Sequence, residues 1–254
     1  MSTEAKTTPK TVNVPDLGQP AGVITKTVGI FIISQFIAIF LVELAVAIIN
    51  HGNAQDVFNN SISAQFFFVL IAESLAFWLV WFLLKRRKLN LGAIGLGRRP
   101  RASDLSWALK GYMAAFLLAI LSSAIVSLFL PHVNLNQKQN LGFNNISGAS
   151  GSVLAFVALV ILPPLGEEPL MRGYLFSGLR RHWRFIWALC VTSLLFGLAH
   201  LEVGSGTPLV WGAAIETFFL SAVLCYLREK TGVLYAGILV HMLNNMLAFF
   251  VTYR

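Results

Sequence analysis

Charged residues are scarce in this 254-residue chain. They make up 12% of the sequence, whereas about a quarter of the residues are charged in an ordinary soluble domain. Hydrophobic residues account for 56%, and they occur in long runs rather than in alternation with polar residues, which is typical of helices embedded in lipid. The composition therefore excludes a soluble globular fold and predicts an all-α, polytopic membrane protein.

Cysteine is nearly absent, and the two cysteines do not form a metal-binding motif. Cys190 and Cys225 both fall inside apolar runs, without the CxxC or Cys/His spacing of a zinc site. We interpret them as small residues of the helix core. The sequence also contains no HExxH, the motif of the common zinc peptidases.

The N-terminal segment lacks apolar periodicity. We predict that residues 1–22, which are rich in Lys, Thr and Pro, form a short disordered cytoplasmic tail. The apolar run that follows has no small-residue cleavage site, so we expect it to remain as the first helix. Residues 23–254 are predicted to form a single transmembrane domain.

Seven segments are apolar over about the 20 residues that cross a bilayer. The fourth contains Pro163, Pro164, Gly166 and Pro169. Because proline frees backbone carbonyls that then need new partners, we predict that this helix is broken and lines protein or water. The predicted spans lie near 24–49, 64–84, 105–130, 152–177, 185–201, 208–227 and 232–252.

Acidic residues are fewer than basic ones, which gives a net charge of +8. If the N-terminus is inside, 16 of the 19 Lys and Arg residues lie on the cytoplasmic side, Lys138 and Arg254 lie outside, and Arg172 lies within the fourth span. This distribution predicts a cytoplasmic N-terminus and an external C-terminus, with basic loops facing anionic headgroups of the lipid bilayer. It accounts for the charge without a nucleic-acid partner, and we expect none.

Several polar residues nevertheless lie inside the predicted helices. A charged side chain at a helix centre costs about 2.5–3.5 kcal/mol on insertion scales, so each such residue needs a partner or a function. Glu43, Glu73 and Glu216 have no basic neighbour at helical spacing, and we interpret them as protonated or hydrogen-bonded rather than catalytic. The main group comprises Glu167, Glu168 and Arg172 in the fourth helix, Phe196 and His200 in the fifth, and His241 and Asn245 in the seventh.

The spacing within this group predicts different roles for its members. Glu168 and Arg172 are four residues apart and can form an ion pair on one helix face. Glu167 is rotated by about 100° from Glu168, which leaves it free for chemistry. His241 and Asn245 again share a face. A polar cluster that only fixes helix packing is the alternative, but this combination exceeds what packing needs and predicts a functional site.

These three segments resemble, in order and spacing, the EExxxR, FxxxH and HxxxN motifs of the CAAX protease and bacteriocin-processing family, which includes the type II CAAX prenyl endopeptidases. Every signature position is matched, and the resemblance covers about residues 90–247. It implies an intramembrane endopeptidase in which Glu167 and His200 activate the attacking water while His241 and Asn245 stabilise the oxyanion. Phe196, one turn before His200, is expected to form an apolar wall beside it.

The chemistry of the residues agrees with this resemblance, since peptide hydrolysis needs a base, an acid and oxyanion donors. We predict metal-free catalysis and no cofactor. Zinc bound by Glu167, His200 and His241 is the alternative. The expected partner is a membrane-associated peptide or protein, either a prenylated CAAX-type tail or, in the bacterial membrane that we expect, a bacteriocin-like peptide. A proton- or ion-coupled transporter and a non-catalytic immunity or scaffold protein are the alternative functions.

Overall fold

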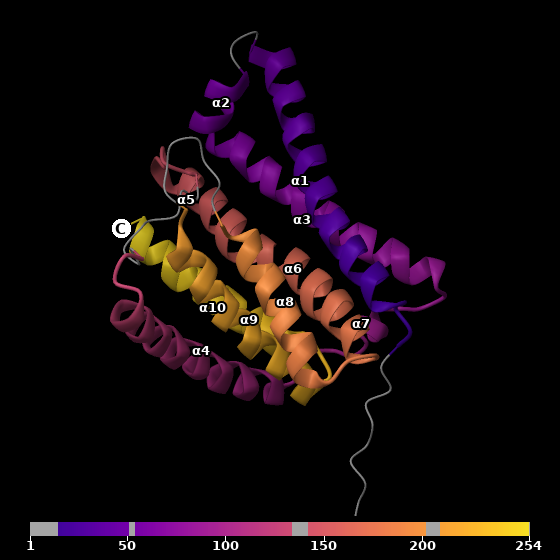
Figure 1. The fold of residues 1–254 in the computed structure, drawn as a ribbon. Coiled ribbons are helices and arrows are strands. Elements are labelled where there is room, and N and C mark those ends of the chain that lie inside the picture. The colour runs from indigo at the N-terminus through magenta and orange to yellow at the C-terminus, as the bar shows by residue number, and fades with distance from the viewer. Residues whose placement is uncertain (1–14, 51–53, 134–141, 202–208, 254) are drawn as a thin grey trace, which may run out of the picture.

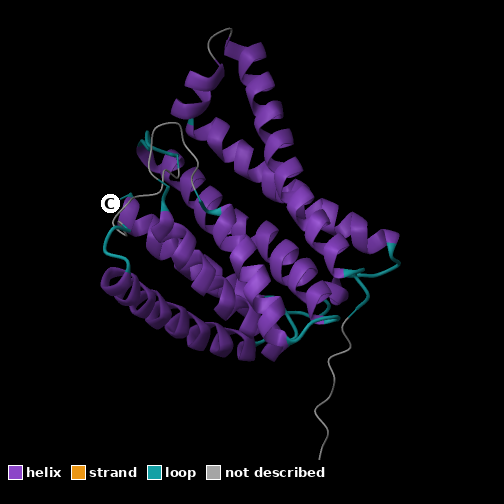
Figure 2. Ribbon diagram, in the orientation of Figure 1, coloured by secondary structure: helices purple, strands orange, loops and turns teal. Residues whose placement is uncertain are grey.

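The computed structural model describes residues 15–50, 54–133, 142–201 and 209–253. The described part of the chain is helical, with short connecting turns and no strand (Figures 1 and 2). Its elements are α1 (Pro20–Asn50), α2 (Ala54–Asn60), α3 (Ile62–Arg86), η1 (Leu91–Ile94), α4 (Ala102–Phe129), α5 (Gly148–Phe156), η2 (Val157–Ile161), α6 (Leu162–Glu168), η3 (Pro169–Phe176), α7 (Ser177–Arg180), α8 (Phe185–Ala199), α9 (Trp211–Thr231) and α10 (Tyr235–Thr252).

Five helices of the described part are long and apolar enough to cross a membrane. The helix α8 is apolar but shorter, and α9 ends in the charged segment 228–230. The predicted all-helical, polytopic fold is confirmed, and the number of seven crossings stays a prediction. Large apolar side chains such as Phe36 and Phe40 are 70% and 63% exposed, as expected of residues that face lipid. The five spans are Pro20–Ile49, Ile62–Arg86, Ala102–Phe129, Gly148–Arg180 and Tyr235–Thr252.

The fourth predicted helix is continuous from Gly148 to Arg180, so the expected break takes another form. Two π-helical stretches, η2 and η3, interrupt its α-helical geometry. The first precedes Pro163 and Pro164, and the second begins at Pro169. Proline has no N–H to donate, and single π-helical turns are frequent at functional sites. The prolines thus rearrange the hydrogen bonds of this rod without ending it.

The rod from α5 to α7 lies in the middle of the bundle. On one side it packs against α3, and its η3 and α7 segments also contact α1 directly. On its other side it contacts α10 and α8, which pack in turn with α9 and α4 (Figure 1). This order of neighbours places the polar residues of the rod between helices on both sides rather than against lipid.

One end of the bundle collects the basic loops. Leu234 donates from its backbone to the Gly95 carbonyl, and Arg180 forms an ion pair of 2.8 Å with Glu229. Lysine side chains at this end lie over aromatic rings, as expected at a membrane interface. The clustering agrees with the predicted cytoplasmic face, whose orientation remains a prediction. The pairs are Lys85 with Trp81, Lys110 with Trp107 and Lys230 with Tyr226.

The loop before α4 fixes the start of α10. Arg98 binds both carboxylate oxygens of the buried Asp104, at 2.7 and 2.5 Å, and this hydrogen bonding raises the pKa of the Arg98 guanidinium. The Tyr235 hydroxyl donates to the Arg98 carbonyl. Because Tyr235 begins α10, the loop sets the position of the helix that carries His241.

Part of the segment predicted as a disordered tail, residues 15–22, belongs to the folded domain. Residues 1–14 lie outside the described part, but Leu17 is fully buried in the core cluster of α3 and the central rod. The helix α1 begins at Pro20 rather than near residue 23, and proline at a first helical position loses no hydrogen bond. The ordered domain therefore extends at least to residue 15.

Candidate active site

A buried ion pair connects the two turns of the central rod that carry the first motif. The Arg172 Nη1 atom donates to Glu168 Oε1 at 2.8 Å, and both side chains are fully buried. Four-residue spacing brings the two groups to one face, as predicted. The same Oε1 atom lies 3.0 Å from His241 Nδ1. A continuous chain of Arg172, Glu168 and His241 thus joins the rod to α10.

His241 also faces the second glutamate. Its Nε2 atom lies 3.8 Å from Glu167 Oε2, which is an ion-pair distance but too long for a hydrogen bond. Glu167 Oε2 has no hydrogen-bond partner in the described part of the chain. The sequence grouped His241 with Asn245, whereas in the structure its nearest polar neighbours are the two glutamates. The imidazole therefore lies between Glu168, which Arg172 neutralises, and Glu167, whose Oε2 atom has no hydrogen bond in the described part of the chain.

Phe196 packs against three members of the site. Its ring centroid lies 4.2 Å from the Arg172 guanidinium carbon, 4.7 Å from the His200 ring and 5.8 Å from the His241 ring. The expected apolar wall beside His200 is present. A ring face over a guanidinium is also stabilising, so Phe196 covers Arg172, a contact that the sequence spacing did not indicate.

Asn245 binds a backbone carbonyl that the prolines leave free. Its Nδ2 atom donates to the Leu159 carbonyl at 3.1 Å. In an α-helix this carbonyl would accept from residue 163 and in a π-helix from residue 164, but Pro163 and Pro164 both lack an N–H. Asn245 therefore supplies the missing donor, and this bond fixes the plane of its carboxamide. The second N–H of this amide takes no part in the bond to the Leu159 carbonyl.

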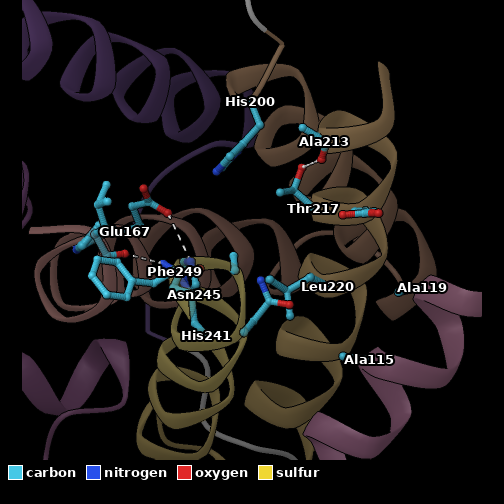
Figure 3. Close-up of a pocket in the computed structure, with 15 residues that line it drawn as sticks. Ala115, Ala119, Glu167, His200, Ala213, Thr217, Leu220, His241, Asn245 and Phe249 are labelled. Atoms are coloured by element: carbon cyan, nitrogen blue, oxygen red, sulfur yellow. Dashed lines mark hydrogen bonds and ion pairs between the residues drawn. The ribbon is translucent and has the colours of Figure 1, made fainter. Parts of the chain in front are cut away.

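Four of the motif residues line one cavity of about 270 Å³ between α4, the central rod, α9 and α10: Glu167, His200, His241 and Asn245. Figure 3 shows His200 pointing into it from the end of α8, toward Glu167, with His241 and Asn245 on α10. His200 Nδ1 lies 2.8 Å from the Phe196 carbonyl, so its Nε2 atom is the one directed inward. The lining comprises Ala115, Ala119, Leu159, Pro163, Glu167, His200, Ala213, Glu216, Thr217, Leu220, His241, Asn244, Asn245, Ala248 and Phe249.

Two carboxylates that the sequence indicated as structural lie at the site. Glu216 lines the cavity from α9. Glu73 packs on Gly166, the residue before Glu167: a Cβ at position 166 would meet the Glu73 backbone carbonyl and Cβ at 2.9 Å. Glycine is thus required for the close approach of α3 to the rod. The sequence could not indicate these positions, because neither glutamate has a partner at helical spacing and both positions depend on contacts between helices.

The alternative zinc set does not gather in this arrangement. In the described ranges, no three or more His, Cys, Asp or Glu side chains lie close enough to hold one metal ion. Glu167 and His241 are adjacent, but His200 stands across the cavity from them. The placement of these donors therefore does not fit a preformed metal site, and catalysis without metal stays a prediction.

Comparison with known protein families finds a match, and it covers the helices that form the cavity from α5 to α10. Residues 149–247, from α5 to α10, match the family described as type II CAAX prenyl endopeptidase Rce1-like. No curated protein and no solved structure matches the chain. The matched segment contains all three motifs, from Glu167 to Asn245. In this segment the chain is similar to the type II CAAX prenyl endopeptidase family, in agreement with the resemblance that the order and spacing of its motifs indicated.

Proposed function

We propose that this protein is an intramembrane endopeptidase that hydrolyses a peptide bond of a membrane-associated peptide or protein. The observation that carries the proposal is the placement of Glu167. Its Oε2 atom has no hydrogen-bond partner among the described residues, and the side chain lines the cavity that His200 also enters. A carboxylate oxygen without a hydrogen bond inside a membrane helix is costly, and a general base for water accounts for it.

In the proposed reaction, Glu167 takes a proton from a water molecule while the water oxygen attacks the scissile carbonyl carbon. His200, on the opposite side of the cavity, orients this water. Collapse of the tetrahedral intermediate breaks the C–N bond, and the proton passes to the leaving amine, which departs neutral. The acid and base functions of such a pair each contribute typically 10²–10⁴-fold to the rate.

The oxyanion of the intermediate is assigned to donors on α10. Asn245 keeps one N–H available after its bond to Leu159. His241 is assigned as an imidazolium in this step, since its Nδ1–H is bound by Glu168 and a donor is needed at Nε2 as well. Preorganised donors of this kind are each worth roughly 10²–10³-fold. The ion pair of Glu168 with Arg172 positions His241 without contacting the substrate.

The substrate enters from within the membrane or its surface, which suits a lipid-anchored CAAX-type tail or an amphipathic bacteriocin-like peptide. We place the N-terminus and the loops around residue 90 in the cytoplasm, on the strength of the basic end of the bundle. Cysteines introduced at the exposed positions Ser103 and Ser147, at opposite ends, should differ in labelling by a membrane-impermeant thiol reagent on intact cells. Equal labelling of both would contradict this topology.

Cleavage itself is tested with purified protein in nanodiscs and a quenched-fluorescent peptide library. Wild type should cut at one bond that mass spectrometry can define, and Glu167→Gln should lose at least about 10²-fold in kcat/KM. The control is Glu43→Gln, which removes an intramembrane carboxylate of α1 away from the cavity. Equal cleavage by wild type and Glu167→Gln would overturn the proposal.

A further inference from the structure

The catalytic cavity is acidic. It contains the carboxylates of Glu167 and Glu216, and no Lys or Arg is among the described residues that line it. The basic residues of the described chain lie at the loop end of the bundle, apart from Arg172, which is bound by Glu168 and covered by Phe196. The described lining thus places two carboxylates in one cavity, together with the imidazoles of His200 and His241, of which His241 lies 3.8 Å from Glu167.

Glu216 is the carboxylate that the catalytic scheme does not use. It lies outside the three motifs, on the second turn of α9, and its side chain is exposed to the cavity. The structure gives it neither a hydrogen bond nor an ion pair within the described ranges, unlike its neighbour Thr217, whose hydroxyl donates at 2.7 Å to the Ala213 carbonyl. A carboxylate among mostly apolar lining residues favours a charged or hydrogen-bonding partner, and the cavity is where such a partner can reach it.

We propose that Glu216 is a specificity-determining residue that binds a cationic group of the substrate, a lysine or arginine side chain close to the scissile bond. The inference rests on the proposed peptidase function. A sphere of the cavity's volume would be about 8 Å across, and an extended chain advances about 3.5 Å per residue. The cation therefore lies within about two residues of the bond that Glu167 attacks.

Charge and geometry favour a peptide cation over other occupants. A lysine or arginine side chain combines a charged head with an apolar stem, and the cavity offers carboxylates beside Ala115, Ala119 and Leu220. A bare metal ion would need several converging ligands, which the described residues do not provide here. An acidic substrate segment would be repelled by both carboxylates.

The test compares peptides that are identical except for one residue next to the scissile bond: Lys, Gln or Glu. Wild type should prefer Lys over Gln by at least about tenfold in kcat/KM, since hydrogen bonds to charged groups typically contribute 10- to 100-fold. In Glu216→Gln this ratio should fall toward one. In Glu43→Gln, whose carboxylate lies on another helix, the ratio should stay at the wild-type value.

A binding measurement separates this inference from the peptidase function. Fluorescence anisotropy with the Glu167→Gln protein should show tighter binding of the Lys peptide than of the Gln peptide, and the added Glu216→Gln change should abolish the difference. If wild type cuts no peptide but this difference is present, the peptidase proposal fails and the cation site stands. An unchanged Lys-to-Gln ratio in Glu216→Gln, in either assay, overturns the cation site.

Discussion

The two adjacent glutamates should respond in opposite ways to the same conservative substitution. Glu168→Gln removes the negative partner of Arg172, whose guanidinium is fully buried and binds Glu168 at 2.8 Å. Breaking a buried pair by neutralising one partner costs on the order of 3–5 kcal/mol, because the other charge is left uncompensated. A change of 1 kcal/mol shifts the melting temperature of a chain of this length by roughly 2–4 °C, so a fall of about 6–20 °C is expected.

Glu167→Gln should leave the melting temperature nearly unchanged. The Glu167 side chain is 19% exposed, and its Oε2 atom has no hydrogen bond to lose among the described residues. The amide keeps the shape of the side chain but cannot act as a base, so activity should be lost while the fold remains. The two variants thus separate a structural carboxylate from a catalytic one.

The assay is thermal unfolding of detergent-solubilised protein, followed by tryptophan fluorescence, in parallel with peptide cleavage. A double variant, Glu168→Leu with Arg172→Met, provides the matched control because it removes both charges. Replacing a buried ion pair by apolar residues is often neutral or stabilising, so the melting temperature of this variant should lie well above that of Glu168→Gln. The variant should still be inactive, because His241 has lost its hydrogen-bond partner. A stable Glu168→Gln together with an unstable Glu167→Gln would show that the two roles are reversed.

Three further outcomes are expected. Gly166→Ala should lower the melting temperature, because its Cβ would press against the Glu73 backbone. The double variant Gly166→Ala with Glu73→Ala should recover only part of this loss, because the backbone contact remains. Complete recovery of the melting temperature would contradict the backbone contact. Asn245→Ala should destabilise by about 1–3 kcal/mol, since the Leu159 carbonyl loses its donor, and a melting curve equal to wild type would refute this role. Active protein should carry no stoichiometric zinc, and elemental analysis that finds one zinc per chain, lost together with activity on chelation, would disprove metal-free catalysis.

Relations within one helix could be predicted from the sequence because helical geometry fixes them. The ion pair of Glu168 with Arg172 follows from four-residue spacing, and the contact of Phe196 with His200 follows from the same rule. Long apolar runs likewise predicted the helical, membrane-spanning fold. These features depend only on helix geometry and on the preference of apolar residues for lipid, so the sequence is enough to predict them.

Relations between helices could not be predicted in this way. The Phe196 ring covers Arg172, and Glu73 packs on Gly166 from a helix almost a hundred residues earlier in the chain. Periodicity identifies which face of a helix is polar, but not which neighbour that face meets. Spacing placed His241 on one helix face with Asn245, and only the packing of helices shows that it also lies beside the two glutamates.

Pro163 and Pro164 combine a relation within one helix, which the sequence predicts, with a contact between helices, which it does not. Pro163 and Pro164 together deprive the Leu159 carbonyl of both its α-helical and its π-helical donor, which is evident from the sequence alone. Inside a membrane such a carbonyl must find a partner within the protein, so a donor on a neighbouring helix is required. The structure identifies that donor as Asn245. A residue of the third motif is thus held in place by the prolines of the first motif's helix, and the irregular helix is part of the means by which the catalytic cavity is assembled.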